Sequence, residues 1–175
     1  MPVRTKLNAT NYHRSLASLM VLASNEVLYS KHKKWVAVKH PGVSLEFRVG
    51  SGKATYHSSP RLRTGVRKHQ ITYGVKMIAS KLTSRNVAMK WRTGKEIKCM
   101  GYYDKNVTMQ TLLAHTILHE YAHFYQTLTG GREYGSVHND EFYRILNRLH
   151  ECGLADDLLD WLMQHDIFRN MSFHN

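Results

Sequence analysis

The sequence predicts an α+β fold, in which an N-terminal helix is followed by a small, mostly antiparallel sheet and then by further helices. Residues 11–29 and 111–128 place apolar side chains at three- and four-residue steps, which is the period of a partly buried helix. Between them, short runs of alternating apolar and polar residues are separated by Gly, Pro and Ser, as in strands joined by turns. A helix, then several strands, then helices is the order typical of α+β proteins.

Each expected element has a local signal. Leu16, Leu19, Met20, Ala23 and Val27, for example, give the first helix one apolar face. In chain order, the expected elements are a helix over 11–29; strands over 35–39 and 43–49 around a turn at 40–42; a loop over 50–65 with a short strand near 54–57; a strand over 70–78, or equally a helix that begins there and runs through 81; a second hairpin of strands 86–91 and 97–103; and helices over 111–128, 140–151 and 154–165.

The most informative segment is His119-Glu120-Tyr121-Ala122-His123, an H-E-x-x-H pattern inside the expected helix over 111–128. Side chains four positions apart lie on the same face of a helix, so His119 and His123 can offer two imidazole nitrogens to one metal ion. Glu120 projects near the same point, where it can act as the general base on a metal-bound water. The pattern therefore predicts a catalytic zinc site.

A catalytic zinc ion usually takes three protein ligands and leaves one position for water. The next histidine, His138, follows a glycine-rich stretch in which the chain can reverse. A second helix, antiparallel to the first, would bring His138 back to the metal, and Glu141 is the competing third ligand. A third histidine six residues after His123 is absent, because Thr129 occupies that position.

His115 lies one helical turn before His119. Because residues 115 and 123 are about 12 Å apart along a helix axis, the three histidines of this stripe cannot all bind one ion. We expect His115 to support the metal site or to line its cleft, with a plain surface histidine as the alternative. His150 and His165 have no spacing that indicates metal binding and are expected to be ordinary histidines.

The run that ends in the H-E-x-x-H pattern, together with His138-Asn139-Asp140-Glu141-Phe142, resembles the SprT-like metalloprotease domain, over roughly residues 85–150. That family has a pattern similar to T-L-x-H-E-x-x-H followed by H-G-x-x-F, and it includes Spartan-type proteases that degrade proteins crosslinked to DNA. The resemblance implies a zincin-like fold and a zinc cofactor. It also implies a set of site residues, with metal ligands His119, His123 and His138 and the catalytic base Glu120.

The chain departs from the family pattern in three places. Asn139 stands where the family has glycine, and asparagine is among the residues that best tolerate a positive φ. Cys99 and Cys152 are the only cysteines, so the four-cysteine zinc ribbon of many bacterial members is missing. Residues 1–65 match no pattern known to us. These departures leave the substrate less defined than the metal site.

Charge is distributed unevenly along the chain. Residues 1–110 hold 21 Lys+Arg and 4 Asp+Glu, a net charge of +17, whereas residues 111–175 hold 4 and 9, a net charge of −5. A basic half predicts binding to a polyanion such as DNA, because contacts to phosphates release counterions. Trp91, Tyr102 and Tyr103 could stack on exposed bases, although aromatic residues in strands more often belong to the core. The candidates for phosphate contact are Arg61, Arg63, Arg67, Lys68, Lys90, Arg92, Lys95 and Lys98.

Length and composition indicate one domain over residues 1–175, with a basic part (1–110) and a metal-binding helical part (111–175). Two distant cysteines make no disulfide framework, and no stretch is apolar enough for a signal peptide or a membrane span. We therefore expect a cytoplasmic monomer without membrane contact. A nucleoid, a nucleus, or a host cell that contains a viral protein are compatible locations.

Together, these features favour a zinc-dependent endopeptidase that acts on DNA-bound or DNA-crosslinked proteins and contacts single-stranded or junction DNA. Tyr134 or Tyr143 is the candidate for stabilising the oxyanion, and residues 97–103 are the nearest candidate for an edge strand that pairs with the substrate backbone. One alternative is a nucleic-acid-binding protein with a structural or vestigial zinc site, with Glu141 as a fourth ligand. Another is a general zinc peptidase with no role on DNA.

Overall fold

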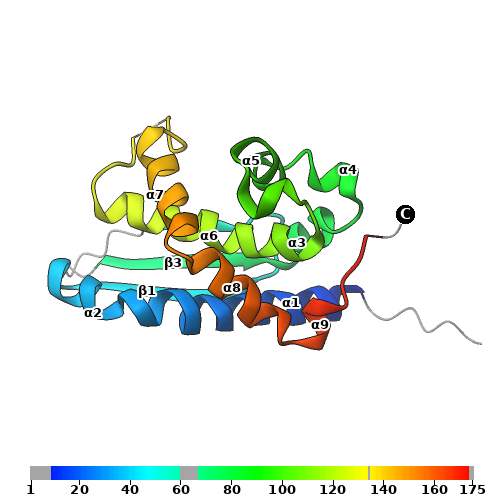
Figure 1. Ribbon diagram of the computed structural model, residues 1–175. Coiled ribbons are helices and arrows are strands. Elements are labelled where there is room, and N and C mark those ends of the chain that lie inside the picture. The colour runs from blue at the N-terminus through cyan, green and yellow to red at the C-terminus, as the bar shows by residue number, and fades with distance from the viewer. Residues whose placement is uncertain (1–8, 60–66, 134, 174–175) are drawn as a thin grey trace, which may run out of the picture.

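The computed structural model describes residues 9–59, 67–133 and 135–173, and this part of the chain has the α+β fold that the sequence predicts (Figure 1). It is mostly helical, with one small sheet of three strands. In chain order, the elements are α1 (Ala9–Ala23), the π-helix η1 (Ser24–Tyr29), α2 (Ser30–Lys39), β1 (Val43–Gly50), β2 (Tyr56–Ser58), β3 (Arg67–Gly74), α3 (Val75–Lys81), α4 (Arg85–Ala88), α5 (Arg92–Met100), the 3-10 helix η2 (Tyr102–Lys105), α6 (Met109–Leu128), α7 (Asp140–Glu151), α8 (Leu154–Met163) and α9 (Asp166–Arg169).

The N-terminal helix extends further than predicted. α1, η1 and α2 follow one another without a break, so the chain is helical over residues 9–39. The strand expected over 35–39 and the hairpin after it are therefore wrong. The alternation in that segment does not reflect a sheet, because Val36 is buried on one side of α2 while Val38 is exposed. Pro41 is the residue that ends the helix, since proline disfavours helical backbone in the residue before it.

The sheet is mixed rather than mostly antiparallel. Its strand order is β1-β3-β2. β1 and β3 run parallel along their whole length, and β2 pairs antiparallel with β3, with His57 opposite Ile71. β1 and β2 correspond to the strands expected over 43–49 and near 54–57. The segment over 70–78 is divided, because β3 ends at Gly74 and a helix begins at the next residue.

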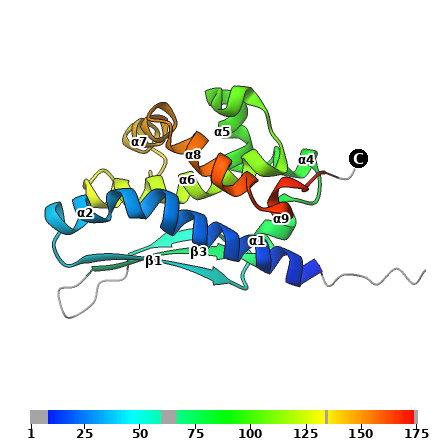
Figure 2. The same ribbon diagram turned by 60° about the horizontal axis from the view of Figure 1, so that its bottom comes forward.

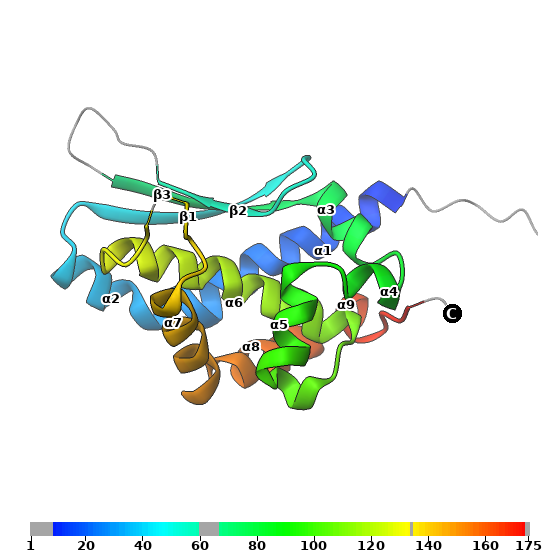
Figure 3. The same ribbon diagram turned by 90° about the horizontal axis from the view of Figure 1, so that it is seen from above.

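One face of the sheet is covered by helices. Along β1, Leu45 and Phe47 are buried and their neighbours are exposed, as expected for a sheet with one face in water. α1 and α6 pack on the covered face, and Figures 2 and 3 show the sheet as an outer layer beside these long helices. α8 packs against both α1 and α6, and the apolar core fills the space between the layers.

The segment from α4 to η2 is helical, so the second hairpin, expected from strands 86–91 and 97–103, is wrong. Gly94 does not mark a turn. It lies inside α5, where a Cβ atom would come within 2.3 Å of the carbonyl oxygen of Ala88, so glycine permits close packing of α5 on α4. Gly101 has φ +85° and ends α5.

The three helices expected in the C-terminal part are present as α6, α7 and α8. Thr108 begins α6 with a capping box that includes Thr111. Asn139 begins α7 by accepting a hydrogen bond from the backbone N–H of Phe142. Nowhere in the described part of the chain does a helix combine the length and apolar character that crossing a bilayer requires.

Candidate metal centre

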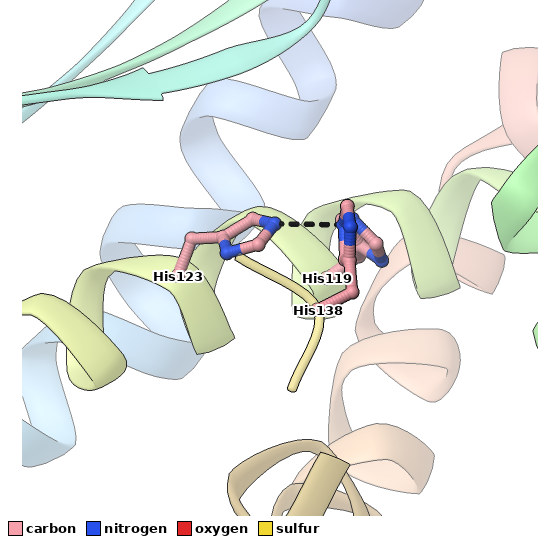
Figure 4. Close-up of side chains that lie close together, drawn as sticks. All are labelled: His119, His123 and His138. Carbon is pink, nitrogen blue, oxygen red and sulfur yellow. Dashed lines mark hydrogen bonds between the residues drawn. The ribbon is translucent and has the colours of Figure 1, made fainter. Parts of the chain in front are cut away.

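Three histidine side chains converge beside the middle of α6 (Figure 4). His119 and His123 lie one turn apart on this helix, and the segment before α7 brings His138 against both. The Nε2 atom of His138 is 3.1 Å from that of His119 and 3.2 Å from that of His123. The predicted ligand set is therefore assembled, and ring nitrogens within 4.8 Å of one another could hold a metal ion.

The hydrogen bonds of the two helix histidines leave their Nε2 atoms without protons. Nδ1 of His119 lies 2.9 Å from a carboxylate oxygen of Glu96, which can only accept, so this nitrogen donates. Nδ1 of His123 donates in the same way to Oε1 of Gln126, at 3.2 Å. Both Nε2 atoms are then bare acceptors that face His138, whose one Nε2 proton cannot satisfy both. A cation between the three nitrogens removes this repulsion, as in metal sites whose histidines donate their other N–H outward.

Glu96 on α5 is the central hydrogen-bond partner of the metal centre, and its role was not predicted from the sequence. Its Oε2 atom accepts from His119 and from Nε2 of His115, each at 2.9 Å, and its Oε1 accepts from the hydroxyl of Tyr143 at 3.3 Å. Burial alone would raise the pKa of Glu96, but the histidine hydrogen bonds outweigh it and hold that pKa well below the usual range. The sequence did contain one signal for Glu96, because it is the only acidic residue between positions 47 and 103.

Glu96, His115 and His119 also lie close enough together to form a second group that could hold a metal ion. His115 is fully buried and supports the site, as one of the two alternatives predicts. Its Nδ1 atom lies 3.2 Å from Nε2 of His150, which stacks on Tyr102 with 3.8 Å between ring centroids. His150 is therefore not an ordinary surface histidine, and burial lowers its pKa to about 3.

Gln126 connects His123 to the segment of the chain that carries His138. This side chain is fully buried, and its amide nitrogen donates to the carbonyl of Val137 at 2.8 Å and to the side-chain oxygen of Asn139 at 2.9 Å. Asn139 has φ −88°, so its position does not need the positive φ that glycine allows. The asparagine instead supplies hydrogen bonds that a glycine cannot make.

Burial lowers the pKa values of two of the three converging histidines, His123 and His138, and keeps these two side chains neutral at pH 7. Burial, followed by the charge of His119, lowers the pKa of His123 to about 3, and the same two causes lower that of His138 to about 4. Metal binding requires neutral imidazoles. These two histidines could therefore bind a metal at neutral pH without first losing protons.

Glu120 is buried between α6 and the sheet. Burial raises its pKa above the usual range, although His119 and Lys81 oppose this shift and the backbone N–H of His57 on β2 hydrogen-bonds to the carboxylate. A carboxyl group with a raised pKa is a better proton acceptor near neutral pH. Glu120 therefore has the character expected of a general base.

A buried lysine balances the two carboxylates. Nζ of Lys81 donates to the hydroxyls of Thr93 and Thr116, each at 3.0 Å. Burial lowers the pKa of Lys81 to about 8, and the charges of Glu120 and Glu96 oppose that shift. Lys81 was not predicted from the sequence, because nothing in its local spacing distinguishes it from a surface lysine.

The edge strand beside α6 is β2, not residues 97–103, which form parts of α5 and η2. Its His57 side chain lies 3.0 Å from His69 on β3 and 2.9 Å from the guanidinium of Arg132. Arg132 follows α6 in the chain, so this contact ties the segment between α6 and α7 to the sheet.

The alternative site residues lie elsewhere. Glu141 does not reach the histidines, because its carboxylate forms two hydrogen bonds with Arg144, at 2.6 and 2.7 Å. The hydroxyl of Tyr143 accepts from Arg92 at 3.4 Å and donates to Glu96, so it lies at the rim of the centre. Tyr134, the other candidate for stabilising the oxyanion, is outside the described residues.

The basic residues expected to contact nucleic acid do not form one patch in the described part of the chain, and Arg61 and Arg63 lie outside that part. Arg67 and Lys68 are exposed at the start of β3, where Lys68 pairs with Glu46 at 2.7 Å. The start of β3 and α5 lie on different parts of the molecule (Figure 3). The other four are exposed on α5 and just before it: Lys90, Arg92, Lys95 and Lys98.

The aromatic residues considered for base stacking belong to the core. Tyr102 is buried against His150, and Trp91 and Tyr103 pack partly buried against the apolar core. None of the three forms an exposed stacking surface.

Compared with models of known protein families, with curated proteins and with solved structures, the chain has no match in any of the three. The likeness to the SprT-like domain therefore stays a resemblance of motif and spacing. The geometry of the metal centre carries the functional interpretation.

Proposed function

We propose that the chain is a zinc-dependent endopeptidase. The observation that carries this proposal is the convergence of three imidazole nitrogens next to Glu120, with Nε2 distances of 3.1 and 3.2 Å. Nitrogens arranged tetrahedrally around zinc at its usual bond length lie about 3.3 Å apart. Three histidine ligands also leave a fourth position for water, which distinguishes catalytic zinc sites from closed structural ones.

A zinc ion held by these histidines would supply an acidified water molecule and polarise the scissile carbonyl. Glu120 would serve as the general base, taking up a proton from the attacking water and passing it to the nitrogen of the leaving amine. Glu96 and Gln126 hold the protons of the two helix histidines on Nδ1, which keeps both Nε2 atoms available as ligands. Lys81 supplies a positive charge near the buried Glu120.

We further propose that β2 binds the substrate backbone and that the substrates are proteins bound to DNA. β2 is an edge strand that packs on α6, and its His57 N–H already contacts Glu120. Extended peptides commonly add to such an edge. Support for a DNA-bound substrate comes from the net charge of +17 on residues 1–110, because a basic surface concentrates a protein on phosphates.

The test is cleavage of a basic DNA-binding protein by zinc-loaded wild type, with and without single-stranded DNA, beside Glu120→Gln. The glutamine keeps the shape of the helix but cannot accept a proton. We expect the variant to retain zinc and to lose cleavage by about 100- to 10,000-fold. DNA should accelerate the wild type, and added salt should weaken that acceleration.

Other outcomes would separate the alternatives. Cleavage by Glu120→Gln at the wild-type rate would remove Glu120 as the base. Cleavage that needs Glu120 but ignores DNA would keep the peptidase and remove the DNA-bound substrate. Zinc binding without cleavage in either condition would favour a nucleic-acid-binding protein with a structural zinc site.

A further inference from the structure

A cavity of about 410 Å³ lies between α5 and α7, next to the metal centre. Both helices project from the same side of α6, away from the sheet (Figure 3). Three side chains in the wall of the cavity are cationic, and two are apolar or weakly polar. Two more belong to the hydrogen-bond network of the metal centre. The lining residues are Lys90, Arg92, Lys95, Cys99 and Met100, together with Glu96 and Tyr143.

Hydrogen bonds connect this cavity directly to a predicted metal ligand. The guanidinium of Arg92 donates to the hydroxyl of Tyr143 at 3.4 Å, and that hydroxyl donates to Glu96 at 3.3 Å. Glu96 in turn accepts from Nδ1 of His119 at 2.9 Å. Only the side chains of Glu96 and Tyr143 therefore separate the cavity from the metal centre. If a polypeptide binds with its scissile bond at the metal centre, a side chain close to that bond would lie in the cavity.

The three cations of the cavity outnumber the one carboxylate in its wall and form no ion pair in the described part of the chain. Lys90, Arg92 and Lys95 are exposed, and none of them forms an ion pair there, whereas Lys68 and Arg144 do. The carboxylate of Glu96, which also lines the cavity, offsets one of the three positive charges, and its oxygens already accept hydrogen bonds from His115, His119 and Tyr143. The cavity therefore has an excess of positive charge that an anionic group would match.

We propose that this cavity binds an acidic side chain, Asp or Glu, of the polypeptide substrate close to the scissile bond. The inference rests on the proposed peptidase function and adds a substrate preference to it. A carboxylate would contact the cationic rim, while the side chains of Met100 and Cys99 would cover the methylene groups of the substrate residue. A cavity that opens beside the metal centre fits a single side chain better than a continuous sugar-phosphate backbone, which follows an extended basic groove.

Binding and cleavage are measured separately to test this preference. The binding assay uses zinc-loaded Glu120→Gln protein and fluorescein-labelled peptides with Glu, Gln or Lys at each scanned position. The cleavage assay uses zinc-loaded wild type and the same peptides without nucleic acid. We expect one position at which Glu is preferred over Gln by about ten-fold, the size of one charge-assisted hydrogen bond.

Two charge reversals serve as test and control. Lys95→Glu should abolish the preference for Glu and create one for Lys, since the substituted side chain is exposed and the fold does not depend on it. Lys76→Glu makes the same change at an exposed position of α3, away from the cavity, and should keep the wild-type preference.

The outcomes distinguish this inference from the proposed function. Equal binding of Glu and Gln peptides at every position would overturn the acidic-side-chain pocket, whether or not cleavage occurs. A preference in binding that Lys95→Glu removes, without cleavage of any peptide by wild type, would support the pocket and reject the peptidase. If a single-stranded oligonucleotide binds more weakly to Lys95→Glu while the peptides show no preference, the cavity is a phosphate site and the proposal fails.

Discussion

At the scale of single residues, Glu96 decides how the metal centre is held. One carboxylate oxygen accepts from both His115 and His119, so it fixes the proton and the ring orientation of a metal ligand. Glu96→Gln removes the charge and one of the acceptor sites. We expect zinc affinity to fall by about 10- to 100-fold, measured by competition with a chelator of known affinity.

Glu141→Gln is the matched control for Glu96→Gln. Glu141 is also a carboxylate near the site in sequence, but it pairs with Arg144 on the surface. The zinc affinity of the Glu141→Gln variant should equal that of the wild type. Equal zinc affinity of Glu96→Gln and wild type would contradict the positioning role of Glu96, and a loss in Glu141→Gln would point to the alternative ligand.

The histidines that converge in the candidate metal centre were predictable from the sequence, whereas the residues that hold them in place were not. His119, Glu120 and His123 follow from a helical spacing that the sequence displays, and His138 from a reversal of the chain after it. Glu96 and Lys81 reach the site by tertiary packing across more than 20 residues, for which no local pattern exists. Predicting the roles of Glu96 and Lys81 would have required knowledge of the three-dimensional fold.

At the scale of elements, Asn139 joins helix capping to metal binding. Its side chain caps α7, accepts from Gln126, and donates to the carbonyl of Gly131 at 3.0 Å. Asn139→Ala should lower the free energy of unfolding by about 1 kcal/mol, as loss of an N-cap does. It should also weaken zinc binding, because the preceding His138 loses its support.

Asn139→Gly provides the comparison. Glycine is a tolerated N-cap and should cost only a few tenths of a kcal/mol relative to asparagine through the cap itself. Urea unfolding of the zinc-free proteins should therefore place the glycine variant between wild type and Asn139→Ala. An alanine variant as stable as wild type would show that the cap contributes nothing here.

The long helices were predicted correctly, whereas the two segments expected to form hairpins were not. α6 and α7 carry an apolar stripe over several turns and clear N-caps, so periodicity decides their type. The segments over 35–39 and 86–103 are short, and a short apolar run fits a strand and one side of a helix equally well. In the second case Gly94 was taken for a turn residue, whereas it provides close contact between helices.

At the scale of the whole molecule, buried histidines make stability depend on pH. Burial lowers the pKa of His57 to about 3 and that of His69 to about 4, below the ordinary value of 6.5. As pH falls through 6.5 the unfolded chain takes up these protons and the folded chain does not. Stability is therefore complete above pH 6.5 and declines toward pH 4, by about 1.4 kcal/mol per pH unit for each group.

Urea unfolding of chelator-treated protein at pH 7.5, 6.0 and 5.0 measures this decline without a contribution from metal. The double variant His57→Gln, His69→Gln should be less stable at pH 7.5 but should show a shallower dependence on pH. An unchanged slope in the double variant would assign the acid sensitivity to other groups.

The arrangement of the sheet could not be derived from the sequence. β1 and β3 are parallel neighbours although β2 lies between them in the chain, and only β2 pairs antiparallel. Turn residues identify hairpins, in which neighbouring strands are consecutive, but they carry no information on a parallel partner. The overall class was predictable because the order of helices and strands suffices for it.

The packing of α1 against α8 also governs how the chain matures during synthesis. Residues 9–23 leave the ribosome long before residues 154–163, and the side of α1 that α8 covers stays exposed until then. Such a nascent chain presents unpaired apolar surface and depends on chaperones or rapid completion. The H-E-x-x-H helix also packs on α8, so its surroundings are finished at the same late step. A peptidase of this design would therefore complete the surroundings of its metal centre only after α8 has been synthesised.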